Sequence, residues 1–446
     1  MRVEKDSIGE MEIEEGSYAG IHTLRARENF KSSSGNTSYE IIKGIAIVKR
    51  CAAIANNRAG KLNEEKCGAI VEACDEILSG KYREELKLPR IQGGAGTSTN
   101  MCLNEVIANI ALEKLGKNRG EYQFLNPLED VNMSQSTNDV YPTGVKIAAI
   151  KLLRELVEEI KELQKELQEK EHKFASVYKL GRTQLKDAVP ITLGQEFGAY
   201  AEALSRDRWR LYKAEERIRV VNIGGTAIGT GVGAPIKYRF AVTDELKKFT
   251  GYGIARAENL IDCTQNVDVF VEVSGLLKSY SVNLSKIAND LRLMDSGPVS
   301  GLGEIVLPKL QAGSSIMPNK YNPVGVEFIK QVYFKVIGND CSITAAAAEG
   351  EFELNPMLPL IAELLIENIE LLRDCTKILR EKVIKGIEAD SERCREYLEK
   401  SPSVATLLIE KIGYEELTSI LKESEKTGKN YKEIIEERAA KKNETK

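Results

Sequence analysis

Histidine is scarce in this sequence, with His22 and His172 as the only two among 446 residues. This scarcity argues against a histidine-based zinc site, which needs several imidazole ligands close together. It also limits the acid–base schemes open to a catalytic site, because histidine is the side chain that most readily exchanges protons near neutral pH. Any enzymatic chemistry must therefore rest mainly on other residue types.

Long apolar runs, paired cysteines and an excess of one charge are missing as well. No stretch approaches the roughly 20 apolar residues of a membrane span, so we expect a cytoplasmic protein without a membrane partner. The eight cysteines form no Cys-x-x-Cys pair, which favours reduced, structural thiols. Sixty-three basic against sixty-seven acidic residues leave a net charge of −4, which is too balanced to indicate nucleic-acid binding.

Apolar residues at helical spacing dominate the middle and the later part of the chain. The first run starts near Val145 and ends near Leu167, with Glu and Lys between its apolar positions. Four comparable runs cover residues 193–221, 267–294, 324–348 and 358–387. Five long helices without strand-like alternation between them predict an all-α fold built around an extended helical bundle.

The segment from Gly313 to Pro323 contains glycine, proline and asparagine at a density typical of a loop. A helical pattern follows it, so the loop ends at a helix N-terminus, where free backbone N–H groups favour anions. The loop offers two hydroxyls, one ammonium and one carboxamide, which belong to Ser314, Ser315, Lys320 and Asn322.

Three more polar segments each adjoin a predicted helix. They are residues 92–101, which contain Thr97; residues 130–143, which contain Ser136, Thr137 and Asn138; and residues 181–190, which contain Thr183 and Gln184. Their glycines allow a ligand to approach the backbone closely, and their hydroxyls and amides supply neutral hydrogen-bond donors. A Gly-rich segment at residues 223–235 is not a P-loop, because it lacks the following Lys-Ser/Thr and the strand–loop–helix context.

These polar segments predict a site for a small substrate with two negative charges. Neutral donors, helix N-termini and one lysine can together hold two carboxylates. The sequence shows no metal-binding cluster, nucleotide motif or Ser-His-Asp triad, so we predict no metal site and no bound cofactor.

The order Gly-Ser-Ser-x-Met-Pro-x-Lys-x-Asn-Pro resembles the signature of the aspartase/fumarase superfamily of lyases. The other polar segments are similar to further blocks of this family, and the resemblance covers about residues 1–395. It implies a three-domain fold with a central long-helix bundle, and we place the domains at residues 1–139, 140–392 and 393–446. It also implies a homotetramer whose sites are shared between subunits.

The family reaction is a β-elimination that proceeds through a carbanion, and the resemblance implies a role for each matching residue. Ser314 is expected to be the general base that removes a proton next to a carboxylate. That carboxylate becomes doubly charged and would be held by Thr97, Ser136, Thr137, Thr183 and Ser315. Lys320 and Asn322 would hold the other carboxylate, and Asn138, Thr183 and Gln184 would surround the leaving group.

Three interpretations of this resemblance stay open. Fumarases carry histidine at the position of Gln184, whereas aspartases carry glutamine or histidine, so Gln184 favours an ammonia-lyase acting on L-aspartate. Fumarate hydratase is the alternative enzyme. A non-catalytic member, comparable to the lens crystallins of this superfamily, is the third interpretation, and the intact Ser314, Lys320 and Asn322 argue against it. Activation by a divalent cation is left open.

Overall fold

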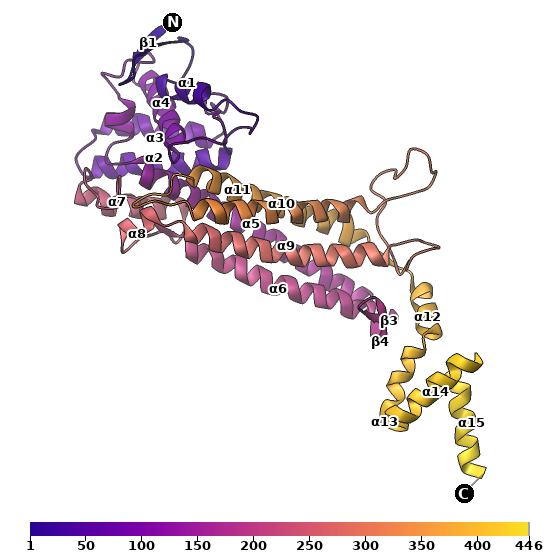
Figure 1. Ribbon diagram of the computed structural model, residues 1–446. Coiled ribbons are helices and arrows are strands. Elements are labelled where there is room, and N and C mark those ends of the chain that lie inside the picture. The colour runs from indigo at the N-terminus through magenta and orange to yellow at the C-terminus, as the bar shows by residue number, and fades with distance from the viewer. Residues whose placement is uncertain (445–446) are drawn as a thin grey trace. The chain divides into compact units, whose positions relative to one another are not determined.

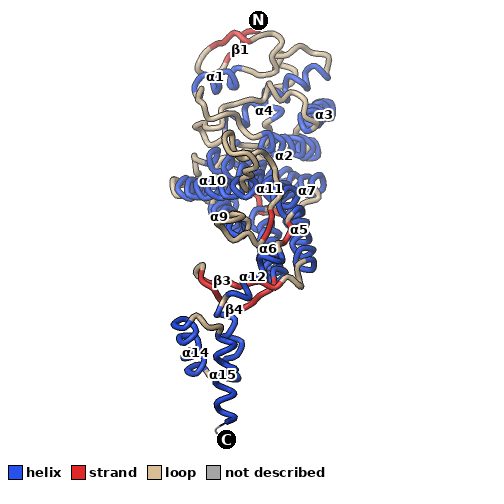
Figure 2. Tube along the Cα trace, turned by 90° about the vertical axis from the view of Figure 1, so that its right-hand side faces the viewer, coloured by secondary structure: helices blue, strands red, loops and turns tan. Residues whose placement is uncertain are grey.

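The computed structural model describes residues 1–444, and helices dominate it, as the sequence predicted (Figures 1 and 2). Strands are short and occur as four two-stranded sheets within the described residues. Within this part of the chain, none of the helices combines the length and the apolar character needed to span a membrane.

The five predicted long helices are present. They are α5 (Thr137–Lys173), α6 (Leu193–Ile218), α9 (Asp268–Met294), α10 (Val324–Ala347) and α11 (Leu358–Ile378). Helix α5 begins eight residues before the apolar run that predicted it, so the polar segment around Ser136 lies at a helix start.

The chain divides into two compact units. Unit 1 comprises residues 1–160, 207–282 and 331–376, and unit 2 comprises residues 161–206, 283–330 and 377–446. The three-domain division at residues 139 and 392 stays a prediction.

Interhelical polar contacts accompany the buried apolar faces of the bundle in unit 1. The Tyr280 hydroxyl of α9 lies 2.7 Å from the Thr376 hydroxyl of α11, and both side chains are buried. Arg154 of α5 forms an ion pair with Glu215 of α6. The two buried hydroxyls need each other because their loss of water is otherwise uncompensated, whereas the Arg154 side chain is about half exposed.

The rest of unit 1 consists of shorter elements. They are β1 (Arg2–Lys5), β2 (Glu10–Ile13), α1 (Ile21–Asn29), α2 (Tyr39–Arg58), α3 (Glu64–Leu78), α4 (Thr97–Lys114), η1 (Pro127–Val131), β5 (Val220–Val221), α7 (Ile236–Thr250), β6 (Ala255–Arg256) and α8 (Leu260–Gln265). The sequence of residues 39–79 predicts two helices with a break near residues 60–63, and the structure confirms it. Asn63 caps α3 by accepting a hydrogen bond from the Lys66 amide.

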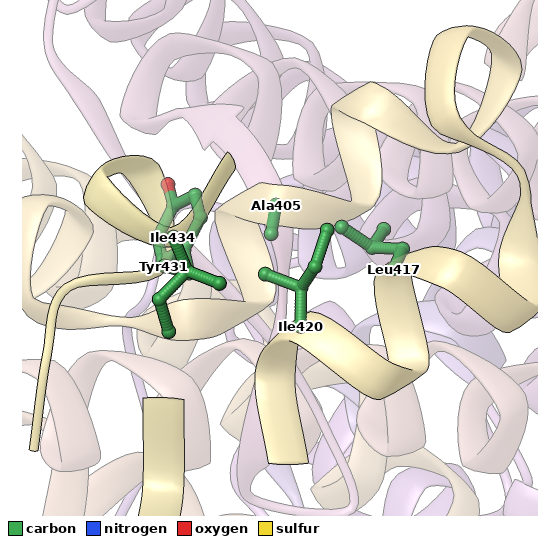
Figure 3. Close-up of a cluster of buried hydrophobic side chains, with 5 residues drawn as sticks. All are labelled: Ala405, Leu417, Ile420, Tyr431 and Ile434. Atoms are coloured by element: carbon green, nitrogen blue, oxygen red, sulfur yellow. The ribbon is translucent and has the colours of Figure 1, made fainter. Parts of the chain in front are cut away.

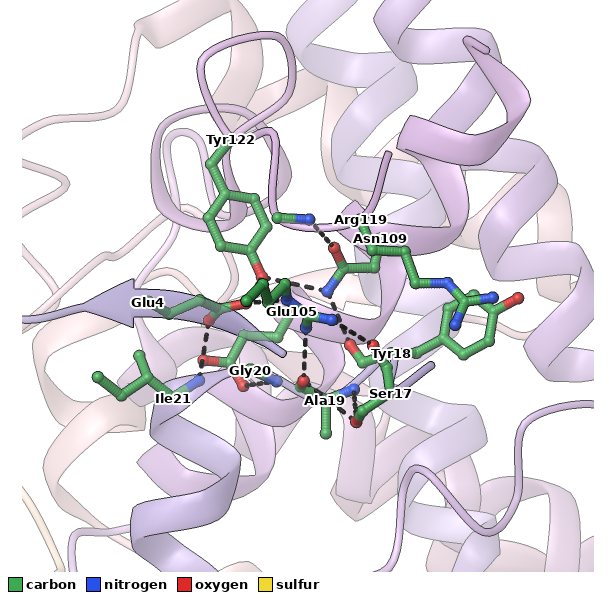
Figure 4. Close-up of polar contacts among 12 residues, drawn as sticks. Glu4, Ser17, Tyr18, Ala19, Gly20, Ile21, Glu105, Asn109, Arg119 and Tyr122 are labelled. Atoms are coloured by element: carbon green, nitrogen blue, oxygen red, sulfur yellow. Dashed lines mark hydrogen bonds and ion pairs between the residues drawn. The ribbon is translucent and has the colours of Figure 1, made fainter. Parts of the chain in front are cut away.

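The polar sequence of residues 1–36 predicts irregular structure, and this prediction is wrong, because the segment contains the β1–β2 hairpin and helix α1. No side chain next to α1 in sequence caps its start. Instead, the buried carboxylate of Glu105 in α4 accepts hydrogen bonds from the backbone amides of Gly20, His22 and Thr23. Figure 4 shows the contact between Glu105 and Gly20. A cap supplied from 85 residues away leaves no local signal in the sequence.

Unit 2 contains the remaining short elements. They are β3 (Tyr178–Thr183), β4 (Lys186–Thr192), β7 (Ile305–Val306), η2 (Leu379–Val383), η3 (Ile384–Gly386), β8 (Glu388–Ala389), α12 (Ser391–Lys400), η4 (Pro402–Leu408), α13 (Ile409–Ile412), α14 (Tyr414–Thr427) and α15 (Tyr431–Glu444). The last helices share a small apolar core of Ala405, Leu417, Ile420, Tyr431 and Ile434 (Figure 3).

Two glycines allow α2 and α5 to approach closely within unit 1. A Cβ atom at Gly44 of α2 would overlap the carbonyl oxygen of Gly144 in α5. A Cβ atom at Gly144 would lie 2.8 Å from the Ile45 amide nitrogen, closer than real Cβ atoms approach. Backbone therefore packs directly against backbone at this crossing, and any side chain there would push the helices apart.

We predict that Gly44→Ala destabilises the protein by about 1–3 kcal/mol, because the added methyl group overpacks this crossing. Gly68→Ala is the matched control, since Gly68 lies exposed in α3 and a Cβ there meets nothing within 4 Å. That variant should be neutral or up to about 1 kcal/mol more stable, because alanine favours helix. Urea denaturation measures both, and equal effects of the two substitutions would contradict the close crossing.

Candidate active site

Thr97 is the first residue of α4 and follows a turn with left-handed backbone. Gly94, Ala95 and Gly96 have φ angles of 87°, 55° and 92°. Glycine is required at position 96, because a Cβ atom there would overlap the ring of Tyr141. No side chain caps α4, and the Thr97 side chain is exposed. The turn thus presents the Thr97 hydroxyl at a helix start, where anions are favoured.

Ser136, Thr137 and Asn138 lie at the start of α5, and the buried carboxylate of Asp139 organises this start. Asp139 accepts hydrogen bonds from the backbone amide of Ser136 at 2.9 Å and from those of Gly224 and Thr226 at 3.1 and 2.9 Å. The Gly-rich segment at residues 223–235 is therefore an anchor for α5. Burial raises the pKa of Asp139 to about 7, against the opposing effect of these hydrogen bonds.

The side chains at this helix start are oriented by their neighbours. The Asn100 amide donates a hydrogen bond to the Thr137 hydroxyl oxygen at 3.1 Å, which leaves the Thr137 O–H free to donate to a ligand. The Asn138 backbone amide likewise donates to the Ser136 hydroxyl oxygen at 3.3 Å. The Asn138 side-chain amide donates to the Ala227 carbonyl at 2.8 Å, so its own oxygen is the atom suited to accept. This arrangement supplies two hydroxyl donors and one acceptor.

The loop with the signature residues closes on itself in unit 2. The Gly313 amide donates to the Lys320 carbonyl at 2.8 Å, and the Asn322 side-chain amide donates to the Gly313 carbonyl at 2.7 Å. Ser315 and Lys320 are exposed, and α10 begins at Val324, directly after the loop, as predicted. Asn322 thus holds the loop in this structure, whereas the resemblance assigns it to a substrate carboxylate.

Ser314 accepts two backbone hydrogen bonds from its own loop. The Ile316 and Met317 amides lie 3.2 and 2.8 Å from the Ser314 hydroxyl oxygen. Two N–H groups directed at one oxygen stabilise negative charge on it. The loop is therefore built in a way that favours the ionised serine.

A cavity of 560 Å³ lies next to this loop in unit 2. Lys320 and Asn322 contribute to its wall together with Arg292 and Lys309. The Lys309 ammonium also lies 4.3 Å from the ring centre of Tyr321. The wall also contains the carboxylates of Asp295 and Asp390, so three cations against two acids leave a slightly positive balance.

Thr183 and Gln184 lie at the end of a β-hairpin, although the sequence shows no strand-like alternation between the long helices. Strands β3 and β4 pair through Thr183 and Lys186, which leaves Gln184 and Leu185 as a two-residue turn. Both turn residues have positive φ, 54° and 60°. Such turns usually contain asparagine or glycine, so this sequence carried no hairpin signal. The turn exposes the Gln184 side chain.

Strained backbone is concentrated in the polar segments. Among the described residues, eight residues other than glycine have positive φ, and six of them are Ala95, Ser134, Gln184, Leu185, Thr226 and Asn319. All six belong to segments that the sequence analysis singled out. Because left-handed backbone costs free energy at such residues, its clustering is typical of functional sites.

A buried ion cluster, which the sequence analysis missed, holds the hairpin in unit 2. The Glu304 carboxylate is fully buried and lies 2.8 Å from the Arg182 guanidinium and 2.9 Å from the Lys179 ammonium. Lys179 also contacts Glu196 at 2.8 Å. Arg182 directly precedes Thr183, so Glu304 fixes the strand that leads into the turn.

The structure places the predicted site residues in two groups. Thr97, Ser136, Thr137 and Asn138 belong to unit 1, where Asn100 of α4 links to Thr137 of α5. The second group belongs to unit 2 and consists of Thr183, Gln184, Ser314, Ser315, Lys320 and Asn322.

We predict that Glu304→Gln lowers the free energy of unfolding by about 3 kcal/mol, because Arg182 loses its carboxylate and the buried Lys179 keeps only Glu196. Glu388→Gln is the control: Glu388 pairs with Lys173 in an exposed ion pair, whose loss should leave stability unchanged. Urea denaturation measures both variants. A Glu304→Gln protein as stable as the parent would contradict the importance of the buried cluster.

The sequence matches a family model described as "Lyase" over residues 9–338. Aspartate ammonia-lyase from a Bacillus species is 47% identical over 434 residues, which are 97% of this chain and 93% of the relative. Aspartate ammonia-lyase from Helicobacter pylori is also 47% identical, over 440 residues that cover 98% of this chain and 94% of the relative.

Two solved structures resemble the fold over nearly the whole chain. A structure from Brucella melitensis, described as fumarate lyase:delta crystallin bound to cobalt, has a TM-score of 0.94 and 46% identity, covering 98% of this chain and 95% of that one. A class II fumarase from Schistosoma mansoni has a TM-score of 0.93 and 32% identity, covering 97% of this chain and 94% of that one.

Proposed function

This chain belongs to the lyase family, and we propose that it is an aspartate ammonia-lyase, which converts L-aspartate reversibly into fumarate and ammonia. The observation that carries the proposal is the 47% identity with aspartate ammonia-lyases over 97% of the chain. The polar segments that match this family also contain the hydroxyls, amides and lysine suited to a dicarboxylate.

Proton removal is the difficult step, because the carbon next to a carboxylate is a weak acid. We assign it to Ser314, whose ionised oxygen takes the proton from the carbon next to the β-carboxylate. The electron pair left on carbon moves into that carboxylate, which becomes doubly charged. The Ile316 and Met317 amides support this assignment, because they stabilise the serine in its ionised form.

The doubly charged carboxylate needs donors that are already oriented toward it. Thr97, Ser136 and Thr137 in unit 1 fit this role, and so do Thr183 and Ser315 in unit 2. For Thr137, the hydrogen bond from Asn100 supports the assignment because it leaves the hydroxyl proton free. Lys320 and Asn322 are assigned to the other carboxylate. For Asn322 this requires the amide to leave the Gly313 carbonyl when substrate binds.

The leaving group is expelled when the electron pair returns from the carboxylate to form the double bond of fumarate. Ammonia is assigned to the surroundings of Asn138, Thr183 and Gln184. The Asn138 oxygen is suited to accept from an ammonium, because the amide nitrogen already donates to Ala227. Glutamine cannot titrate near neutral pH, so Gln184 orients the amine by hydrogen bonding and does not act as an acid. These roles require no cofactor, and activation by a divalent cation stays open.

Fumarate hydratase is the second candidate, favoured by the similarity in fold to a class II fumarase. Hydration of fumarate needs a group that handles water, and a histidine can exchange protons there. Gln184 argues against this alternative. The third interpretation, a non-catalytic protein, is tested by the same experiments.

We further propose that the protein is a cytoplasmic homotetramer in which each site combines segments from different subunits. This assembly would join the unit 1 group around Thr97 and Ser136 with the hairpin and the signature loop of other subunits. The division of the predicted site residues between two units is compatible with such sharing.

We predict that the purified protein forms fumarate from L-aspartate faster than from L-malate, and that Ser314→Ala abolishes this activity while the fold is retained. Fumarate absorbance measures both reactions, and circular dichroism checks the fold. Ile316→Ala is the control within the same loop, because it keeps the backbone amide that contacts Ser314. Faster turnover of malate would favour the fumarase, and no turnover of either substrate would favour the non-catalytic protein.

We predict that two inactive variants complement each other when they form mixed oligomers. Thr97→Ala removes a donor of the unit 1 group, and Ser314→Ala removes the base in unit 2. If subunits share sites, mixed tetramers contain some sites with neither substitution, so co-expression should restore part of the activity. A mixture of the separately purified proteins, without exchange of subunits, is the control. Mixed oligomers without activity, or an active monomer in sedimentation, would contradict shared sites.

A further inference from the structure

Lys49 is a buried cation that none of the assigned roles uses. It lies in the middle of α2, between Val48 and Arg50, and its side chain is 0% exposed. Among residues 1–444, no carboxylate forms an ion pair with it. Its ammonium donates instead to the Asn132 side-chain oxygen at a short distance of 2.6 Å. Because burying an ammonium is costly, a lysine kept there without an ion pair requires an explanation.

A chain of hydrogen bonds leads from Lys49 to the candidate carboxylate site. The Asn132 oxygen that accepts from Lys49 also accepts from the Asn100 amide at 3.2 Å. The same Asn100 amide nitrogen donates to the Thr137 hydroxyl oxygen at 3.1 Å. Two carboxamides therefore connect the ammonium with the hydroxyl at the start of α5, and all four residues belong to unit 1.

The surroundings hold this chain in place. Asn56, one further residue of α2, donates to the Met133 carbonyl at 2.9 Å and accepts from the Ser134 hydroxyl at 2.7 Å. The crossing of Gly44 and Gly144 brings α2 against α5. Helix α2 thus fixes the segment before α5 at several points, which limits the movement of Lys49 relative to Thr137.

We propose that Lys49 is a positioning residue that places a positive charge behind Thr137 and thereby stabilises the doubly charged carboxylate of the intermediate. This inference rests on the proposed ammonia-lyase function and extends it by one residue. Lys49 does not touch the substrate but acts through Asn132, Asn100 and Thr137.

The charge of the intermediate explains why a buried lysine behind Thr137 would speed proton removal. Both substrate carboxylates carry one charge before proton removal, and one of them carries two afterwards. A fixed cation near that group stabilises the intermediate more than the substrate, and only such a difference lowers the barrier. Burial keeps water from screening the interaction.

The competing explanation is structural. Burial lowers the pKa of Lys49 to about 7, and the buried Asp139 carboxylate opposes this shift by favouring the charged ammonium electrostatically. Lys49 could then serve only to balance Asp139, and its replacement would lower stability without a specific effect on the intermediate. The test must therefore separate stability from catalysis.

The experiment compares Lys49→Met and Lys49→Gln with the parent and with Lys146→Met. Methionine removes the charge and the donor, whereas glutamine removes the charge but keeps a donor for Asn132. Lys146 is another buried lysine, in α5, that donates to the Val220 carbonyl, so its replacement controls for the loss of a buried lysine. Each protein is checked for folding and then assayed for kcat and KM with L-aspartate.

We expect both Lys49 variants to lose kcat by about tenfold or more with little change in KM, and Lys146→Met to keep the parent value. A second measurement uses 3-nitropropionate, whose nitro group replaces the reacting carboxylate and ionises to a nitronate that resembles the intermediate. Its affinity should fall in the Lys49 variants far more than that of succinate, which resembles only the substrate.

The inference is overturned if Lys49→Gln keeps the parent kcat, or if 3-nitropropionate and succinate lose affinity equally. A comparable loss of kcat in Lys146→Met would also overturn it, because the effect would then be general. If Lys49→Met does not fold, the kcat of Lys49→Gln alone decides whether Lys49 acts on the reaction.

Activity of the parent protein separates this inference from the proposed function. If the parent is active on L-aspartate and the Lys49 variants are unaffected, only the role of Lys49 is rejected. If the parent is inactive on L-aspartate, the proposed function is rejected and this role with it.

Discussion

Unit 1 depends on buried carboxylates that accept the backbone N–H groups at helix starts. Glu105 of α4 accepts from the start of α1, and Asp139 holds the start of α5 against the Gly-rich turn. Glu363 of α11 accepts from the Ser38 amide at 2.9 Å, at the start of α2. Helix starts leave N–H groups without partners inside the helix, and a carboxylate satisfies them while it interacts favourably with the helix dipole.

These contacts have an electrostatic consequence. Burial raises the pKa of Glu105, and it raises the pKa of both Asp139 and Glu363 to about 7. Burial removes water from these carboxylates, which costs free energy when they are ionised, and the hydrogen bonds from backbone amides partly offset this cost. Cations close to them, such as Arg90 beside Glu363 at 3.3 Å, offset it further.

Residues of the candidate site lie at two further helix starts, those of α4 and α10. Asp139 and Glu105 fill helix starts inside the protein, whereas no side chain caps the start of α4, where Thr97 is the first residue. Helix α10 follows directly after the loop that carries Ser314. Strained turn residues such as Ala95 and Asn319 form part of these turns. These segments leave Thr97 and Ser315 exposed, as the proposed binding of a dicarboxylate requires, and their strained backbone costs free energy that the surrounding helices must offset.

The sequence by itself determined the five long helices, because apolar spacing at 3.6 residues is a local property that survives in any packing. It also identified the four polar segments and, through the signature around Ser314, the family. Only the tertiary structure decided that residues 21–29 form a helix and that Gln184 ends a hairpin, since a distant carboxylate and a strained turn replace the usual local signals. Only the tertiary structure showed that Lys49 contacts Asn132 and that Glu304 contacts Arg182. No local pattern encodes contacts between residues about 80 to 120 positions apart.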